Sequence, residues 1–292
     1  HARSGVRRQA QFPESEAMMK VAIGMRRSGK TYFLYQTINT LLDQGVSQEQ
    51  ILFINFEDDR LLPMNAKEMG KLIDQFYSLY PENHQRRCYL FLDEVQNIEN
   101  WNLVVRRYFD KKDTQIYLTG SSAKLLSTEI NTNLRGRSLA VEIFPFSFQE
   151  YLSAHDIQRT KGPFGQKSLD MIKPHLLTYF AKGGFPAVQN MSATDWRETL
   201  RNYLDTTLLR DIIERHKISN ISLLKYLTST LLKNAASPFS INKFFNDAKS
   251  QGLQISKETL HTYLAYLEDA FLIFSVPFYS ESKKKKNNRP KK

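Results

Sequence analysis

The sequence has 292 residues, of which 41% are hydrophobic and 24% charged, so it is globular in composition and long enough for two domains. Of the 41 basic residues, seven lie in 283–292 and three in 1–12, and the remaining 31 nearly balance the 30 acidic residues. The net charge of +11 therefore sits in the termini, which are either solvated tails or contacts for a phosphate backbone.

The single cysteine, Cys88, excludes an intrachain disulfide, and its apolar neighbours predict a buried thiol. No stretch approaches the roughly 18–20 apolar residues of a membrane span, and no signal-peptide pattern opens the chain. We therefore expect a cytoplasmic protein without membrane partners.

The first predicted elements are a strand at Met18–Ile23 and a helix at Thr31–Leu42, and the loop between them is the most informative motif of the chain. It reads GMRRSGKT, a complete G-x-x-x-x-G-K-[ST] phosphate-binding loop. Lys30 can reach the β- and γ-phosphates, and the Thr31 hydroxyl can ligate Mg²⁺. The candidate ATP-binding residues are Gly24, Met25, Arg26, Arg27, Ser28, Gly29, Lys30 and Thr31.

Four further apolar runs predict strands, with helices between them at Lys67–Leu79 and Trp101–Lys112. Such strands alternating with helices indicate a parallel sheet covered on both faces. The runs are Ile51–Phe56, Cys88–Leu92, Gln115–Thr119 and Leu139–Phe146.

The third predicted strand delivers Asp93 and Glu94 to the sheet edge where ligands bind in open α/β sheets. Asp93 can hold Mg²⁺ opposite Thr31, and Glu94 is placed to polarise an attacking water. The pattern alone also fits a surface strand end. After a phosphate-binding loop it predicts ATP hydrolysis, and it disfavours a small-molecule kinase.

Two polar elements flank the remaining strands. The sequence TGSS at 119–122 ends the fourth strand, where a hydroxyl either lies near the γ-phosphate or belongs to a turn that caps the next helix. The sequence LRGR at 134–137 precedes the fifth strand, and an arginine there cannot easily reach the nucleotide of its own chain. Arg135 or Arg137 either faces the nucleotide of a neighbouring subunit or is a surface arginine.

Beyond about Tyr151 the pattern changes, because residues 156–170 predict a loop or linker and the chain from Leu176 onward is almost wholly helical. A final strand at Phe271–Tyr279 predicts a winged helix-turn-helix, with the last helix at the recognition position. The alternative is an ordinary helical bundle. The predicted helices are Leu200–Ile213, Ile221–Leu232, Ser240–Ala248 and Ser256–Glu268.

Together these motifs resemble the AAA+ superfamily, and in particular a group of prokaryotic ATPases. In that group an AAA+ module precedes a helical and winged-helix region and then a nuclease-like domain of unknown function. The resemblance covers roughly residues 17–282. Besides the loop with its double arginine, it is carried by YLFLDEVQNIENW at 89–101, YLTGSS at 117–122, LRGR at 134–137, EIFPFSFQEYL at 142–152, GGFP at 183–186 and YLDTTLLRDIIERHKI at 203–218.

The resemblance implies phosphate binding by Lys30, metal binding by Thr31 and Asp93, a general base at Glu94, a γ-phosphate sensor at Ser121, a trans arginine at Arg137 and packing near the adenine by Pro186. AAA+ proteins commonly have Asn at the sensor position. The chain also stops in its basic run, where the family would continue. We therefore expect a truncated or naturally short member without nuclease activity.

The sequence thus predicts an α/β P-loop NTPase (AAA+-like) fold, with a helix-flanked parallel sheet followed by a helical lid and a winged-helix domain. The expected function is Mg²⁺-dependent ATP hydrolysis in a nucleotide-driven switch or motor, assembled as a homo-oligomer. The alternative is a nucleotide-gated DNA-binding regulator with little or no turnover, which binds DNA through the winged helix and the basic tail. The predicted boundaries are 1–16 for an N-terminal extension, 17–155 for the ATPase core, 156–235 for the lid, 236–282 for the winged helix and 283–292 for the tail.

Overall fold

The computed structural model describes residues 5–121, 134, 136–157 and 165–276. Its internal contacts divide the chain into two units, His1–Tyr203 and Leu204–Lys292. The phosphate-binding loop belongs to the first unit, and the last helices belong to the second. Within the described ranges, no helix combines the length and apolar character needed to cross a membrane.

A five-stranded sheet forms the centre of the first unit, and all its strand pairings are parallel. Its spatial order is β2-β3-β4-β1-β5, so β4 lies between β1 and β3. The predicted parallel sheet is confirmed. The strands are β1 (Met19–Ile23), β2 (Ile51–Asn55), β3 (Cys88–Asp93), β4 (Thr114–Gly120) and β5 (Ser138–Glu142).

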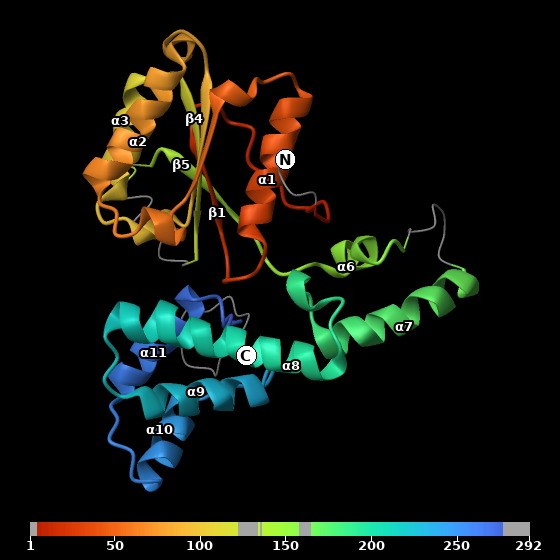
Figure 1. Ribbon diagram of the computed structural model, residues 1–292. Coiled ribbons are helices and arrows are strands. Elements are labelled where there is room, and N and C mark those ends of the chain that lie inside the picture. Colours follow the sequence, from red (N-terminus) through yellow and green to blue (C-terminus); the bar gives the residue numbers. More distant parts are fainter. Residues whose placement is uncertain (1–4, 122–133, 135, 158–164, 277–292) are drawn as a thin grey trace, which may run out of the picture. The chain divides into compact units, whose positions relative to one another are not determined.

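Helices cover both faces of this sheet, with α1 (Lys30–Asp43) on one face and α2 (Ala66–Leu79) and α3 (Trp101–Lys111) on the other (Figure 1). The side chains of β4 are all buried, as expected for a central parallel strand. On the α1 face, the rings of Phe91 and Tyr117 stack with centroids 4.4 Å apart. Cys88 is buried, as predicted.

The fifth apolar run leaves the sheet earlier than predicted, because β5 ends at Glu142. Phe146 then donates its backbone N–H to the Gly184 carbonyl at 2.7 Å, which joins this run to the GGFP segment at 183–186. Pro145 has no N–H to donate, so the run could not continue as a regular ladder through this point.

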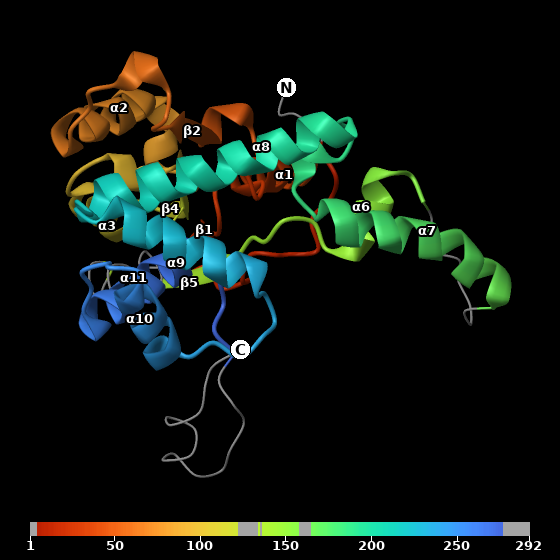
Figure 2. The ribbon, with the colours of Figure 1, turned by 90° about the horizontal axis from the view of Figure 1, so that it is seen from below.

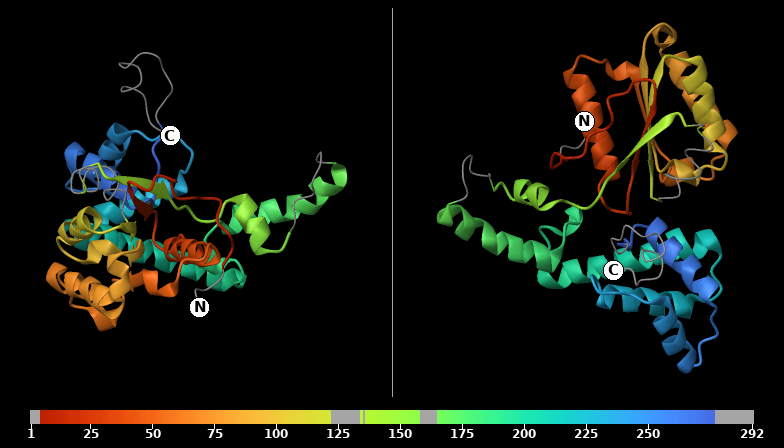
Figure 3. Two further views of the ribbon diagram at one scale, coloured as in Figure 1. Left: turned by 90° about the horizontal axis from the view of Figure 1, so that it is seen from above. Right: turned by 180° about the vertical axis from the view of Figure 1, so that it is seen from behind.

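Two helices follow β5, α6 (Phe148–Ala154) and α7 (Gln166–Lys182), and they lie side by side (Figure 3). The predicted loop at 156–170 is wrong for its last five residues, since α7 begins directly after Gly165. The glycine and proline residues that suggested a loop all precede Gln166, so the predicted loop should have ended at Gly165. A short turn, η5 (Pro186–Val188), then leads to α8 (Ala193–Thr206).

The second unit is helical, as predicted, and contains η6 (Thr207–Glu214), α9 (Ile221–Lys233), α10 (Ile241–Ser250) and α11 (Lys257–Asp269) (Figure 2). The segment η6 is a π-helix, which the sequence pattern did not distinguish from an α-helix. The helices share one apolar core, whose fully buried members are Leu223, Leu224, Leu227, Ile212, Ala248 and Leu267.

The predicted final strand is absent over Phe271–Val276, and the rest of it, residues 277–279, lies outside the described ranges. Phe271 adopts a left-handed conformation with φ 58°, and Leu272 donates its N–H to the Leu267 carbonyl at 3.0 Å. This is the closure of a helix C-terminus, which turns the chain instead of extending it. The winged-helix prediction is therefore not confirmed, and the described part of this unit is a helical bundle.

Candidate nucleotide-binding site

The parallel sheet brings together the ends of strands that are far apart in sequence. Ile23 of β1 is paired with Gly120 of β4, and Leu92 of β3 is paired with Leu118 of β4. The loop after β1 and the acidic pair at the end of β3 therefore emerge at the same carboxyl edge, the edge that binds ligands in open α/β sheets.

The backbone of the loop Gly24–Thr31 has positive φ angles at its two glycines, Gly24 and Gly29. Gly24 has φ 150°, and a Cβ there would lie 2.2 Å from the Ile143 carbonyl oxygen, so no larger residue fits. Gly29 has φ 101° and forms the N-cap of α1, so the loop ends at a helix N-terminus. Free N–H groups and the positive end of the helix dipole both favour an anion here.

Lys30 is buried in the loop and links it to the end of β3. Its Nζ donates to the carbonyl oxygens of Gly24 and Met25, each at 3.3 Å. The same atom lies 3.2 Å from Glu94 Oε1, and only 3% of the Lys30 side chain is exposed. The ammonium group is thus held where the glycine loop and the acidic pair meet.

Asp93 accepts hydrogen bonds on both carboxylate oxygens. Thr31 Oγ1 donates to Oδ2 at 2.8 Å, and Thr119 Oγ1 donates to Oδ1. Thr119 also accepts a bond from the Glu94 backbone N–H at 2.8 Å. Burial, reinforced by the adjacent Glu94 carboxylate, raises the pKa of Asp93 to about 6.

Glu94 has a left-handed backbone conformation, with φ 52°, and its carboxylate points to Lys30. Gln96 donates to Glu94 Oε2 at 2.6 Å and to Ser121 Oγ at 3.4 Å, so it joins the ends of β3 and β4. Burial favours the neutral acid, but Lys30, Gln96 and Arg26 together outweigh it and lower the pKa of Glu94 below its ordinary value. The Glu94 carboxylate is therefore ionised at neutral pH.

A cavity of about 570 Å³ opens over this cluster, entirely within the first unit. Lys30, Thr31 and Glu94 line it together with Pro186 of the GGFP segment. A Cβ on Gly29 would lie 3.8 Å from Pro186 Cγ, so the two motifs approach closely although 157 positions separate their numbers. The lining also includes Gly5, Val6, Arg8, Arg26, Arg27, Tyr32, Tyr35, Asn55, Glu57, Phe146, Ala187 and Tyr203.

The two arginines of the loop have different partners. Arg26 Nη1 lies 2.6 Å from Glu57 Oε1, and the Arg27 guanidinium carbon lies 5.8 Å from the centroid of the Tyr203 ring. Ser28 is fully buried, and its Oγ has no hydrogen-bond partner within the described residues. Of the eight predicted loop residues, five line the cavity, and the carbonyl oxygens of Gly24 and Met25 accept from Lys30. The five are Arg26, Arg27, Gly29, Lys30 and Thr31.

Arg137 lies elsewhere on the first unit. Met19 at the start of β1 is paired with Ser138 at the start of β5, which puts Arg137 at the amino edge of the sheet. There it forms an ion pair with Asp110 of α3, and about half of its side chain is exposed. Arg135, its predicted alternative, lies outside the described residues.

Sequence reasoning missed three residues of the site. Thr119 and Gln96 orient Asp93 and Glu94, and only their positions at the ends of β4 and β3 hinted at this. The prediction of a solvated N-terminal charge block is wrong for Arg8, which is buried and paired with Glu150 at 2.9 Å. Nothing in a local charge count distinguishes such an arginine from its exposed neighbour Arg7.

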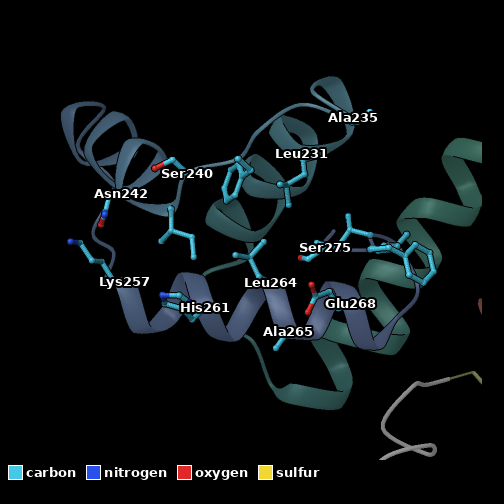
Figure 4. Close-up of a pocket in the computed structure, with 16 residues that line it drawn as sticks. Leu231, Ala235, Ser240, Asn242, Lys257, His261, Leu264, Ala265, Glu268 and Ser275 are labelled. Atoms are coloured by element: carbon cyan, nitrogen blue, oxygen red, sulfur yellow. The ribbon is translucent and has the colours of Figure 1, made fainter. Parts of the chain in front are cut away.

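A second cavity, of about 630 Å³, lies within the second unit (Figure 4). Its wall takes Lys257, His261, Leu264 and Glu268 from α11 and Leu231 from α9. The lining is largely apolar and carries one charge of each sign. The described residues contain no cluster of three or more His, Cys, Asp or Glu side chains arranged for a metal.

Two family models match the chain. Residues 16–152 match the family described as AAA domain, and residues 173–292 match a domain of unknown function, DUF8612. The AAA match contains the loop, the acidic pair, Ser121 and Arg137, and it begins after the N-terminal segment that carries Arg8.

Two curated relatives are similar over most of the chain. An uncharacterised protein of Methanocaldococcus jannaschii is 38% identical over 263 residues, covering 90% of this chain and 57% of the relative. An uncharacterised protein of Haemophilus influenzae is 32% identical over 272 residues, covering 92% of this chain and 64% of the relative. The chain thus spans less than two thirds of the length of either relative.

Solved structures with some similarity include the Aeropyrum pernix ORC1 protein in complex with DNA, at 11% identity and a TM-score of 0.37, over 94% of this chain and 82% of that one. AMPPCP-bound DnaA from Aquifex aeolicus aligns at 15% identity with a TM-score of 0.34, over 68% of this chain and 63% of that one. Both similarities are distant.

We expect Thr119→Val to lower the free energy of unfolding by about 2–4 kcal/mol, because it leaves a buried Asp93 oxygen and the Glu94 N–H without their partner. Thr119→Ser keeps the hydroxyl and should lose about 1 kcal/mol or less, mainly through the missing methyl group. Urea unfolding of the two variants checks this. Equal stability of the valine and serine variants would show that the hydroxyl does not support the acidic pair.

Proposed function

We propose that this chain, whose residues 16–152 match the AAA domain family, binds ATP at Gly24–Thr31 and hydrolyses it. One observation carries the proposal. Thr31 and Lys30, from the loop, contact Asp93 and Glu94 respectively, and Thr31, Lys30 and Glu94 line a single cavity, with Asp93 buried directly behind Thr31. A phosphate-binding loop facing a metal-type aspartate and a glutamate base is the arrangement that ATP hydrolysis requires.

Mg²⁺ fits the residues present, since the Thr31 hydroxyl and the Asp93 carboxylate are hard oxygen ligands already in contact at 2.8 Å. These two residues would hold it, and when bound it neutralises charge on the β- and γ-phosphates. A cation would also stabilise the ionised form of Asp93, whose pKa is raised by burial.

In the proposed reaction Lys30 binds the phosphates and Glu94 accepts a proton from the attacking water. Phosphate oxygens entering the loop compete with the Glu94 carboxylate for the Lys30 ammonium, because both are anions within reach of the same Nζ. Glu94 released in this way accepts a proton from water as the water oxygen bonds to the γ-phosphorus. The bond from that phosphorus to the bridging oxygen breaks, and ADP leaves with the electron pair.

Ser121 and Pro186 complete the proposed site. Ser121 is buried at the end of β4 and is joined to Glu94 through Gln96, so it can sense the γ-phosphate beside the base. Pro186 lines the cavity near Gly29 and would pack against the adenine. ATP turnover in such a site would drive a switch or motor.

Lys30→Ala should weaken ATP binding by more than about tenfold, since it removes a charge-assisted contact to the phosphates. Calorimetric titration with ATP and Mg²⁺ measures this. As a control, Lys20→Ala changes a lysine outside the cavity lining and should leave the Kd unchanged. A wild-type Kd for ATP in Lys30→Ala would show that the loop is not part of the ATP-binding site.

Glu94→Gln should bind ATP but lower turnover by about 10² or more, because it keeps the size of the side chain and removes the base. It should also show a larger rise in Tm on adding ATP than the wild type, since the phosphates no longer displace a carboxylate from Lys30. Release of free phosphate measures turnover. Unchanged turnover would make Glu94 a structural carboxylate, and a phosphorylated small molecule would indicate a kinase.

We also propose that the protein assembles as a homo-oligomer in which Arg137 acts on the nucleotide of a neighbouring subunit. Arg137 and the loop lie at opposite edges of the sheet, and the five residues of β1 span roughly 17 Å. Arg137 therefore does not act on the nucleotide of its own chain, while its exposure leaves it accessible to another subunit.

The ATPase rate per subunit should accordingly rise with protein concentration, and Arg137→Ala should abolish that rise with less than about a twofold change in ATP affinity. Asp110→Asn is the matched variant, because it removes the partner of Arg137 and keeps the arginine. It should retain the concentration dependence. A monomer in sedimentation with ATP, together with a constant rate per subunit, would contradict a trans arginine.

DNA binding is a second candidate function. It is favoured by the two consecutive helices α10 and α11, which follow each other as in a helix-turn-helix, and by the basic residues in 283–292. The described part of the second unit adds little positive charge. Residues 204–276 contain eight lysines and arginines against seven aspartates and glutamates. Binding without sequence preference, and mainly through the tail, is therefore the form that the charges support.

Deleting 283–292 should lower the slope of log K against log salt for duplex DNA by about 6, since seven basic residues would no longer displace counterions. Lys257→Ala, at the start of α11, should lower it by about 1 at most. Fluorescence anisotropy at several salt concentrations measures both slopes. No binding of the intact chain at low salt would eliminate this function, and ATPase assays with and without DNA would show whether the two activities are coupled.

A further inference from the structure

The N-terminal segment, residues 5–9, lies outside the matched AAA domain at 16–152 and yet forms one wall of the nucleotide cavity. Gly5, Val6 and Arg8 line that cavity beside the phosphate-binding loop. A segment that the family model omits therefore touches the site on which the proposed function depends.

The segment is held from two sides by α1 and α6. The Gln36 side chain, on α1, accepts from the Arg8 backbone N–H at 3.1 Å and donates to the Val6 carbonyl at 2.6 Å. The Gln9 backbone N–H donates to Glu150 of α6 at 2.7 Å. These are backbone contacts at positions 6, 8 and 9, so the segment has a fixed register against both helices.

The Arg8 guanidinium connects three elements. Its Nε donates to Glu150 Oε1 at 2.9 Å, its Nη1 to the carbonyl of Ser28 in the loop at 2.9 Å, and its Nη2 to the carbonyl of Phe144 at 2.5 Å. The planar fork of an arginine suits this set, because its donors lie on three separate nitrogens, whereas the three N–H groups of a lysine share one nitrogen. A Cβ on Gly29 would lie 2.9 Å from Nη1, so the arginine packs directly on the loop.

The charge of Arg8 is fully balanced. Glu150 accepts from Arg8 Nε, from the Gln9 N–H and, at 2.9 Å, from the Ser147 N–H, and the two side chains of the ion pair are each 5% exposed. A neutralised, buried pair offers little net charge to a phosphate. Arg8 therefore acts on a nucleotide through the geometry that it imposes on the loop.

The geometry that Arg8 imposes on the loop is the orientation of one peptide group, the one between Ser28 and Gly29. In a trans peptide, the C=O of Ser28 and the N–H of Gly29 point in opposite directions. A hydrogen bond from Arg8 to the Ser28 carbonyl fixes the plane of this peptide and directs the Gly29 N–H away from the arginine. It also polarises the peptide, which makes the N–H a stronger donor.

We propose that Arg8 is a positioning residue for phosphate binding, which orients the Ser28–Gly29 peptide of the loop and ties it to α6 through Glu150. This inference rests on nucleotide binding at Gly24–Thr31. The oriented N–H contacts the phosphates equally in the bound ground state and during reaction, so its loss weakens binding and leaves the chemical step unchanged.

The test compares Arg8→Lys with Arg7→Lys, which makes the same change at the exposed neighbouring residue. Arg8→Lys should raise the calorimetric Kd of ADP and of ATP by about tenfold and raise KM in parallel, with kcat within about twofold of the wild type. Arg7→Lys should leave all these values unchanged. Thermal unfolding without nucleotide establishes that both variants are folded at the assay temperature.

A folded Arg8→Lys protein with a wild-type Kd for ADP would overturn the proposal, and so would a fall in kcat without a rise in KM. Hydrogen exchange on the wild-type protein provides a second test that needs no variant. ADP should slow exchange at residues 5–9 together with the loop, and protection of the loop alone would also overturn the proposal. Absence of ATP hydrolysis would refute only the proposed activity, since the ADP measurements remain valid. Failure of the wild-type chain to bind any nucleotide would overturn both.

Discussion

The buried carboxylate of Asp93 is the constraint on which the candidate site depends. It is desolvated at the end of β3, and a carboxylate in that position must have donors. Thr31 supplies one from the phosphate-binding loop, and Thr119 supplies the other from β4. The same aspartate therefore links three segments at the carboxyl edge of the sheet. The bond between Thr31 and Asp93 also keeps the two oxygens of the proposed metal site together.

Glu94 depends on this arrangement in turn. Its backbone N–H is held by Thr119, and its side chain is held by Lys30 and Gln96. The Glu94 carboxylate is ionised, so it is in the form that can accept a proton. Its ion pair with Lys30 makes it a weaker base until that pair is broken. Exchange of this partner for phosphate is the step that would connect nucleotide binding to catalysis in the proposed mechanism.

The site also extends beyond the segment that matches the AAA domain model. The GGFP segment reaches the loop because Gly184 and Phe146 share a backbone hydrogen bond, and a Cβ on Gly184 would lie 2.2 Å from the Phe146 carbonyl oxygen. On the other side, Arg8 and Glu150 join the N-terminal segment to α6. Residues from both flanks of the AAA domain match thus line the same cavity.

The sequence by itself determined the P-loop, the parallel sheet and the acidic pair, because each is encoded by adjacent residues or by a short apolar period. It also located the helices of the second unit to within a few residues. It failed where one pattern fits two conformations. Phe271–Val276 is as apolar as a strand, but its first two residues close the C-terminus of α11, and η6 has the same residue pattern as an α-helix. Only the tertiary structure decided that Arg8 is buried against Glu150, that Thr119 and Gln96 orient the acidic pair and that Pro186 lies beside Gly29. Apart from the contact of Gln96 with Glu94, these contacts join residues from 25 to 157 positions apart, and partners that meet only through the fold leave no signal in local composition.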